Sequence, residues 1–119
     1  MLAFALSQRG KPYVWGGKNG RPGYDCSGLV AAATAHAGRQ LAGGSKQQFA
    51  TCKNQGRLIS VAEGLRTRGA VLFRMTGDPT HVAFSLGDGS TMEARGKSTG
   101  VNVFGGAAKR TWTHAAIWI

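Results

Sequence analysis

Five short, mostly apolar runs lie between residue 70 and the end of the given sequence, and they constrain the fold more than any other feature. Turn residues separate them, and the Gly87-Asp88-Gly89 stretch between two such runs is a strong β-hairpin signal. Apolar runs this short, bounded by turn residues, are typical of strands. They predict an antiparallel sheet of about five strands. The expected strands span residues 70–74, 80–86, 90–95, 100–104 and 114–119.

The first part of the chain predicts helices. Residues 26–37 are rich in alanine and hold no helix breaker after Gly28, so they predict a buried helix. Asp25 precedes this segment and suits an N-cap, and Gly38 suits its end. The glycine-rich stretch before it, residues 10–24, predicts a loop.

Two shorter helices complete the expected set. Residues 2–9 look helical, and residues 46–54 could form a helix capped by Ser45. Helices that precede a block of strands predict an α+β domain. A chain of 119 residues is the size of one domain, so we expect a single domain over residues 1–119.

The charge balance is strongly basic, with 15 Lys and Arg against 5 Asp and Glu, a formal net charge of +10. Such a surface favours anionic partners such as nucleic acid, a membrane surface or cell-wall polymer, although it could also be a simple solvated surface. No helix-turn-helix, zinc-finger or aromatic RNA-binding signature supports nucleic acid. No run is long enough to span a membrane, and the opening ten residues are too short for a signal peptide.

The chain has two cysteines, Cys26 and Cys52, too few for a disulfide framework. Neither lies in a Cys-x-x-Cys pair, so we expect no zinc site. A bond between them would remove the Cys26 thiol, and we expect Cys52 to be a buried free thiol.

Cys26 is predicted at the first turn of the helix over residues 26–37. The N–H groups and partial positive charge of a helix N-terminus favour a thiolate and lower the pKa of a thiol. A nucleophile also needs a base. His36 lies too far along the same helix, and His114 has no distinctive setting, which leaves His81.

His81 opens one expected strand, and Glu93 lies in the next strand across the 87–89 turn. In such a hairpin the two positions lie roughly opposite one another, with Cβ atoms about 5 Å apart. Glu93 could then accept a hydrogen bond from one ring nitrogen of His81 and leave the other for the thiol, as in a catalytic triad.

Each of these residues also has a simpler explanation. A lone buried cysteine is usually a small hydrophobic residue, and a histidine at a strand start is usually satisfied or solvated. Glu93 and Arg95 could face solvent. The three tryptophans, Trp15, Trp112 and Trp118, are expected in the core rather than in a binding surface.

Residues 10–30, GKPYVWGGKNGRPGYDCSGLV, closely resemble the signature of the NlpC family of cell-wall peptidases, which are papain-like cysteine enzymes. The family pattern Pro-Tyr-x-Trp-Gly-Gly is matched at residues 12–17, and Asp-Cys-Ser-Gly-Leu-Val at residues 25–30. Further blocks are matched downstream, so the resemblance spans nearly the whole chain. These downstream blocks are the Ser-x-x-Gln motif at Ser45 and Gln48, His81-Val82, the 87–89 turn and Glu93-Ala94.

The resemblance implies a role for each matched residue. Cys26 would be the nucleophile, His81 the general base and then acid, and Glu93 the group that orients His81. Tyr13 and the Cys26 N–H would stabilise the oxyanion. In relatives that cut next to a free amino terminus, the positions of Asp25 and Ser27 hold the substrate ammonium group. Ser45 and Gln48 would belong to the substrate site.

Two departures from the family pattern concern the site. The third catalytic position is commonly His, Asn or Gln in the family, whereas this chain has Glu93, whose carboxylate can also orient an imidazole. The Leu-Pro-Arg that precedes the serine motif is replaced by Leu-Ala-Gly-Gly at residues 41–44, which alters one wall of the site.

The resemblance therefore implies a papain-like peptidase without metal or cofactor that cuts peptidoglycan stem peptides, most often between D-glutamate and a diamino acid. We expect a monomer acting at the bacterial cell wall, where anionic polymers could attract its positive charge, either as a phage endolysin or tail-associated domain or as part of a secreted protein. Two alternatives stay open: a non-catalytic basic module that binds cell wall or nucleic acid, and an acyltransferase that uses the same thioester chemistry.

Overall fold

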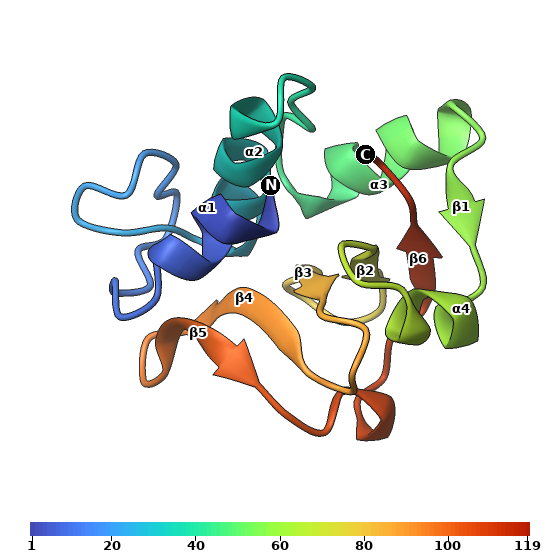
Figure 1. The fold of residues 1–119 in the computed structure, drawn as a ribbon. Coiled ribbons are helices and arrows are strands. Elements are labelled where there is room, and N and C mark those ends of the chain that lie inside the picture. Colours follow the sequence, from blue (N-terminus) through green and yellow to red (C-terminus); the bar gives the residue numbers. More distant parts are fainter.

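The computed structural model describes residues 1–119 and contains four α-helices and a six-stranded sheet (Figure 1). The helices are α1 (Leu2–Ser7), α2 (Cys26–His36), α3 (Ser45–Asn54) and α4 (Val61–Arg66), with a short 3-10 helix η1 (Ala107–Lys109). The strands are β1 (Leu58–Ile59), β2 (Val71–Arg74), β3 (His81–Ser85), β4 (Thr91–Gly96), β5 (Gly100–Phe104) and β6 (His114–Ala116). The predicted α+β class is confirmed.

All neighbouring strands are antiparallel, in the order β1-β6-β2-β3-β4-β5. The five predicted strands are all present as β2 to β6. The sixth strand, β1, was not predicted, and neither was α4. With two residues, β1 is too short to leave a pattern in the sequence, and it forms because β6 offers it a pairing edge.

Both faces of the central strands are buried. On β2, Val71 and Phe73 belong to the large core cluster that α1, α2 and α3 cover, whereas Leu72 belongs to a second cluster with Ala83 and Trp112. Residues of α4 pack against this second cluster on the other face of the sheet. Strands covered on both faces carry nearly continuous apolar runs, which is why these segments do not alternate in sequence.

Helix α2 begins and ends where the sequence predicts. The Asp25 side chain accepts a hydrogen bond from the N–H of Gly28 at 2.6 Å, and Gly38 follows the helix with φ of 86°. Gly28 also permits a close approach, because a Cβ atom there would lie 1.9 Å from the carbonyl oxygen of Gly17. The first turn of α2 therefore packs directly against the glycine-rich loop and fixes Cys26 beside it.

Helix α3 corrects one prediction and is anchored through a buried amide. Its N-cap is Gly44, so Ser45 is the first helical residue and not the cap. Gln48 is 0% exposed and donates to the carbonyl oxygens of Ser27 and Leu41, each at 3.0 Å. These two bonds join α3 to the first turn of α2 and to the loop that connects the two helices.

The tryptophans divide into two groups. Trp112 and Trp118 are buried, as predicted, but Trp15 is 72% exposed, so its expected place in the core is wrong. The glycine-rich loop that carries Trp15 lies outside the packed helices (Figure 1). None of the helices, the longest of which has 11 residues, is long and apolar enough to cross a membrane.

Candidate active site

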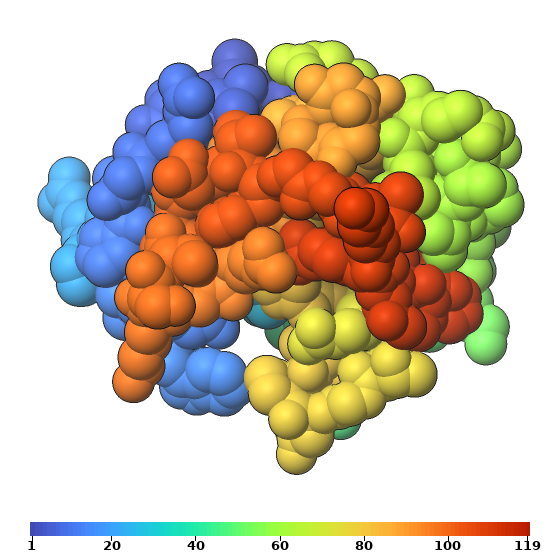
Figure 2. Space-filling model, turned by 90° about the horizontal axis from the view of Figure 1, so that it is seen from below, coloured from blue at the N-terminus to red at the C-terminus, as the bar shows by residue number.

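A cleft of about 520 Å³ lies where the N-terminus of α2 meets the start of β3. In Figure 2 the surface is hollowed between the yellow segment around residues 75–80 and the blue N-terminal loop. Of the residues predicted for the site, the structure brings six together in the lining of this cleft, and Glu93 lies behind them. The six are Tyr13, Asp25, Cys26, Ser27, Ser45 and His81.

His81 and Glu93 form the predicted pair. The Nε2 atom of His81 lies 2.8 Å from Oε1 of Glu93, and both residues are buried. The register is not the expected one: β3 and β4 pair Phe84 with Met92, and this register continued along the strands puts Glu93 opposite Ala83. The contact is therefore diagonal, at a spacing that long side chains can bridge.

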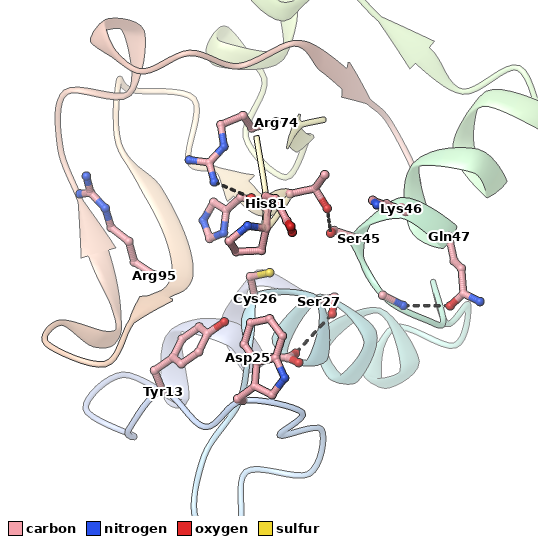
Figure 3. Close-up of a pocket in the computed structure, with 15 residues that line it drawn as sticks. Tyr13, Asp25, Cys26, Ser27, Ser45, Lys46, Gln47, Arg74, His81 and Arg95 are labelled. Carbon is pink, nitrogen blue, oxygen red and sulfur yellow. Dashed lines mark hydrogen bonds between the residues drawn. The ribbon is translucent and has the colours of Figure 1, made fainter. Parts of the chain in front are cut away.

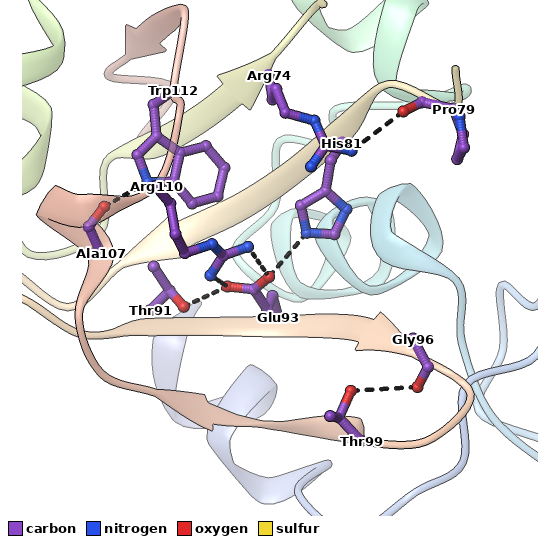
Figure 4. Close-up of polar contacts among 10 residues, drawn as sticks. All are labelled: Arg74, Pro79, His81, Thr91, Glu93, Gly96, Thr99, Ala107, Arg110 and Trp112. Atoms are coloured by element: carbon purple, nitrogen blue, oxygen red, sulfur yellow. Dashed lines mark hydrogen bonds and ion pairs between the residues drawn. The ribbon is translucent and has the colours of Figure 1, made fainter. Parts of the chain in front are cut away.

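Glu93 is held on all sides by hydrogen-bond donors (Figure 4). Arg110 donates to both carboxylate oxygens, from Nη1 to Oε2 at 2.8 Å and from Nη2 to Oε1 at 2.7 Å, and the Thr91 hydroxyl also donates to Oε2. Burial raises the pKa of Glu93, but the hydrogen bonds from Arg110, His81 and Thr91 outweigh it and lower this pKa to about 2. Glu93 is therefore a carboxylate over the physiological pH range.

Arg110 is the residue of this site that the sequence did not reveal. It follows η1, outside any strand, and no motif surrounds it. Its guanidinium also lies over the ring of Trp112, 4.6 Å from the centroid, and Trp112 stacks beside His81 with a centroid distance of 6.2 Å. Arg110 and Trp112 together form the wall behind the His81–Glu93 pair.

Cys26 and His81 line the same cleft, and Cys26 lies just below the His81 side chain in the view of Figure 3. Because Nε2 of His81 donates to Glu93, Nδ1 is the ring nitrogen left for the thiol. Burial raises the pKa of the Cys26 thiol, Asp25 raises it further, and backbone N–H groups, including that of Val82, lower it less. The predicted lowering of this pKa is wrong, because desolvation outweighs the helix N-terminus. The Cys26 thiol is therefore protonated at neutral pH.

Tyr13, Asp25 and Ser27 line the cleft beside Cys26. Burial, with Cys26 and Asp25 nearby, raises the pKa of Tyr13 to about 12, so its hydroxyl keeps its proton and can donate. The Ser27 hydroxyl donates to Oδ1 of Asp25 at 3.3 Å, and the N–H of Gly16 donates to Oδ2 at 3.1 Å. The Asp25 carboxylate is thereby fixed at the edge of the cleft.

The two residues of the Ser-x-x-Gln motif have different places. Ser45 lines the cleft, and its hydroxyl lies 2.5 Å from that of Thr80 across the cleft wall. Gln48 does not line the cleft, so its predicted place in the substrate site is wrong. Gln48 instead points into the protein interior, where its amide donates to the Ser27 carbonyl beneath the cleft.

Three cationic side chains also line the cleft, namely Lys46, Arg74 and Arg95. None of them lies within ion-pair distance of a carboxylate. The two ion pairs of the protein are His81–Glu93 and Arg110–Glu93. The Arg74 guanidinium is anchored by donating to the Pro79 carbonyl at 3.1 Å. Arg95 is exposed, as predicted, and contributes a charge to the cleft rim.

Both cysteines are free, as predicted, and Cys52 is fully buried. Burial raises the pKa of the Cys52 thiol to about 11, which makes it inert at neutral pH. No group of three or more His, Cys, Asp and Glu side chains is arranged to hold a metal ion.

The NlpC/P60 family model matches residues 10–118 of this chain. Peptidoglycan endopeptidase RipB of Mycobacterium tuberculosis is 36% identical over 111 residues, which cover 83% of this chain and 44% of RipB. The bifunctional muramidase/DL-endopeptidase CwlT of Bacillus subtilis is 36% identical over 89 residues, which cover 71% of this chain and 25% of CwlT. The chain thus spans less than half the length of these relatives.

Comparison with solved structures also finds NlpC/P60 domains. The NlpC/p60 domain of the peptidoglycan hydrolase SagA superposes with a TM-score of 0.78 and 32% identity, covering 97% of this chain and 93% of that domain. The papain-like architecture predicted for this chain is confirmed at this level of similarity.

Proposed function

The chain belongs to the NlpC/P60 family, and on that premise we propose that it is a cysteine peptidase that hydrolyses an amide bond in peptidoglycan stem peptides. The observation that carries the proposal is the arrangement of Cys26, His81 and Glu93 at one cleft, with His81 fixed to Glu93 at 2.8 Å. Nucleophile, base and orienting group are the minimum set for covalent catalysis of acyl transfer.

In the first half of the reaction, Nδ1 of His81 takes the proton of Cys26 while the sulfur attacks the carbonyl carbon of the substrate. The oxyanion that forms is stabilised by the N–H of Cys26 and the neutral hydroxyl of Tyr13. Because the raised pKa of the thiol keeps Cys26 protonated at rest, proton transfer to His81 accompanies or precedes the attack.

In the second half, the protonated His81 gives its proton to the leaving amine, and a thioester on Cys26 remains. Water then attacks the thioester, with His81 as the base, and the carboxylic acid product leaves. Glu93 stays ionised throughout and stabilises the imidazolium.

The bond we propose is the one between D-glutamate and the following diamino acid, since the relative CwlT is named as a DL-endopeptidase. The cleft complements such a substrate, because its Asp25 carboxylate suits an ammonium group and its unpaired Lys46, Arg74 and Arg95 suit the carboxylates of the stem peptide. The protein would act at the bacterial cell wall, as part of a phage-delivered or a secreted lytic protein.

The experiment is a digest of purified peptidoglycan by the wild type and by Cys26→Ala, with the released fragments identified by mass spectrometry. Release of stem-peptide fragments by the wild type alone supports the proposal. Binding without release by either protein favours the non-catalytic basic module, and fragments joined to an added amine identify an acyltransferase.

A further inference from the structure

We propose that Arg110 is a positioning residue of the His81–Glu93 pair: its charge cancels that of Glu93 and so sets the pH range in which His81 can accept a proton. This inference rests on the proposed function and concerns the regulation of the same site. Arg110 gives the fully buried carboxylate behind His81 a partner of opposite charge.

The geometry of Arg110 is that of a fixed partner. Its guanidinium makes a bidentate contact with Glu93, at 2.7 and 2.8 Å, and its side chain is 19% exposed. A planar fork of this kind orients a carboxylate as well as neutralising it. With the Thr91 hydroxyl on Oε2, the carboxylate cannot rotate away from His81.

Arg110 and His81 contact the same carboxylate oxygen of Glu93, so the charge of Arg110 lies close to the His81 ring. Nη2 of Arg110 and Nε2 of His81 both contact Oε1 of Glu93, at 2.7 and 2.8 Å, so the two nitrogens lie within about 5.5 Å of each other. At this distance in a buried site, one charge changes proton binding by about one pH unit or more. Glu93 alone favours proton uptake by the pair, and Arg110 opposes it.

Once the pair has taken up a proton, His81 cannot act as a base, whether the extra proton lies on His81 or on Glu93. If His81 holds the extra proton, Nδ1 is occupied. If Glu93 held it, the carboxyl group would donate to Nε2 and His81 would carry its own proton on Nδ1, again leaving no free lone pair for the Cys26 thiol. Loss of Arg110 should therefore move the acidic limb of activity to higher pH.

Other charged or titratable groups face the pair and stay constant in the comparison. Arg74 is the cross-strand neighbour of His81 on β2, and Cys26 faces it from α2. Five further charged or titratable groups line the same cleft: Tyr13, Asp25, Lys46, Asp78 and Arg95.

The test compares the pH dependence of Cys26 alkylation by iodoacetamide, followed by mass spectrometry of the Cys26 peptide, in the wild type and four variants. This readout needs no peptidoglycan substrate, so it stands or falls separately from the proposed function. The buried Cys52 serves as the unreactive internal reference. The variants are Arg110→Gln, Arg110→Lys, Glu93→Gln/Arg110→Gln and, as the matched control, Arg66→Gln, which removes an exposed charge of α4 outside the cleft.

Arg110→Gln should move the acidic limb of alkylation up by about one pH unit. Arg110→Lys keeps the charge, although not the bidentate fork, and should leave the acidic limb of alkylation in place. The double variant restores the charge balance and should return the limb towards the wild type, while Arg66→Gln should match the wild type throughout.

A purely structural role for Arg110 predicts a different result: lower thermal stability but an unchanged profile per folded molecule. An unshifted limb in folded Arg110→Gln, or a shift to lower pH, overturns the proposal. If that variant does not fold, the double variant decides, since a limb displaced from the wild type by one unit or more contradicts charge cancellation.

Discussion

Protonation of Glu93 should destabilise the fold in acid, by an amount set by the groups around it. Glu93 is 1% exposed, and its pKa falls from 4.5 to about 2 in the folded protein. A folded pKa below the unfolded one means that the group contributes stability that is fully present above about pH 4.5 and is lost as the pH falls towards 2. The loss amounts to about 2 kcal/mol at pH 3 and about 3 kcal/mol at pH 2.

The assay is urea unfolding, followed by circular dichroism at pH 7, 5, 4 and 3, of the wild type and Glu93→Gln. The variant should be less stable at pH 7, because Arg110 loses its charged partner. Between pH 5 and pH 3, however, the wild type should lose about 2 kcal/mol more than the variant. The control is Glu63→Gln, which changes an exposed carboxylate and should keep the wild-type slope. Equal slopes for the wild type and Glu93→Gln would refute the reasoning.

Three further substitutions test the packing and the cleft. Gly28→Ala places a Cβ atom 1.9 Å from the Gly17 carbonyl oxygen and should lower stability by about 3 kcal/mol in a thermal melt, whereas Gly105→Ala, with nothing within 4 Å, should not. Gln48→Met removes the buried hydrogen bonds to the Ser27 and Leu41 carbonyls and should cost about 2 kcal/mol in urea unfolding; an unchanged midpoint would contradict this role. Arg74→Gln should raise KM about fivefold for a stem peptide with free carboxylates and little for its amidated form, and an equal effect on both would exclude carboxylate binding.

The sequence was sufficient for the parts of the fold that local patterns encode. The strands β2 to β6 and helix α2, with Asp25 as its cap, follow from short apolar runs, turn residues and helix-capping chemistry. Strand β1 could not be predicted, because two residues carry no period and the strand depends on an edge supplied by β6, over fifty residues later in the chain.

In the candidate site, too, local motifs could be predicted from the sequence, whereas features that depend on tertiary packing could not. The family motif and the hairpin predicted that Cys26, His81 and Glu93 would meet, but their register, the inward turn of Gln48 and the exposure of Trp15 depend on tertiary packing. Arg110 reaches Glu93 from a segment without regular spacing, so only the three-dimensional structure reveals it. The predicted lowering of the Cys26 pKa is wrong for a related reason. The helix N-terminus can be predicted from the sequence, whereas the burial of Cys26 cannot.

The central claim is that Cys26 hydrolyses a stem-peptide amide through a thioester. The most direct measurement is the reaction of an L-alanyl-D-glutamyl-diamino acid peptide in water enriched in ¹⁸O, with mass spectrometry of the dipeptide product. The account predicts one ¹⁸O atom in the new carboxyl group with the wild type and no product with Cys26→Ala or His81→Ala. Failure of the wild type to cleave the peptide, or equal cleavage by Cys26→Ala, would contradict it.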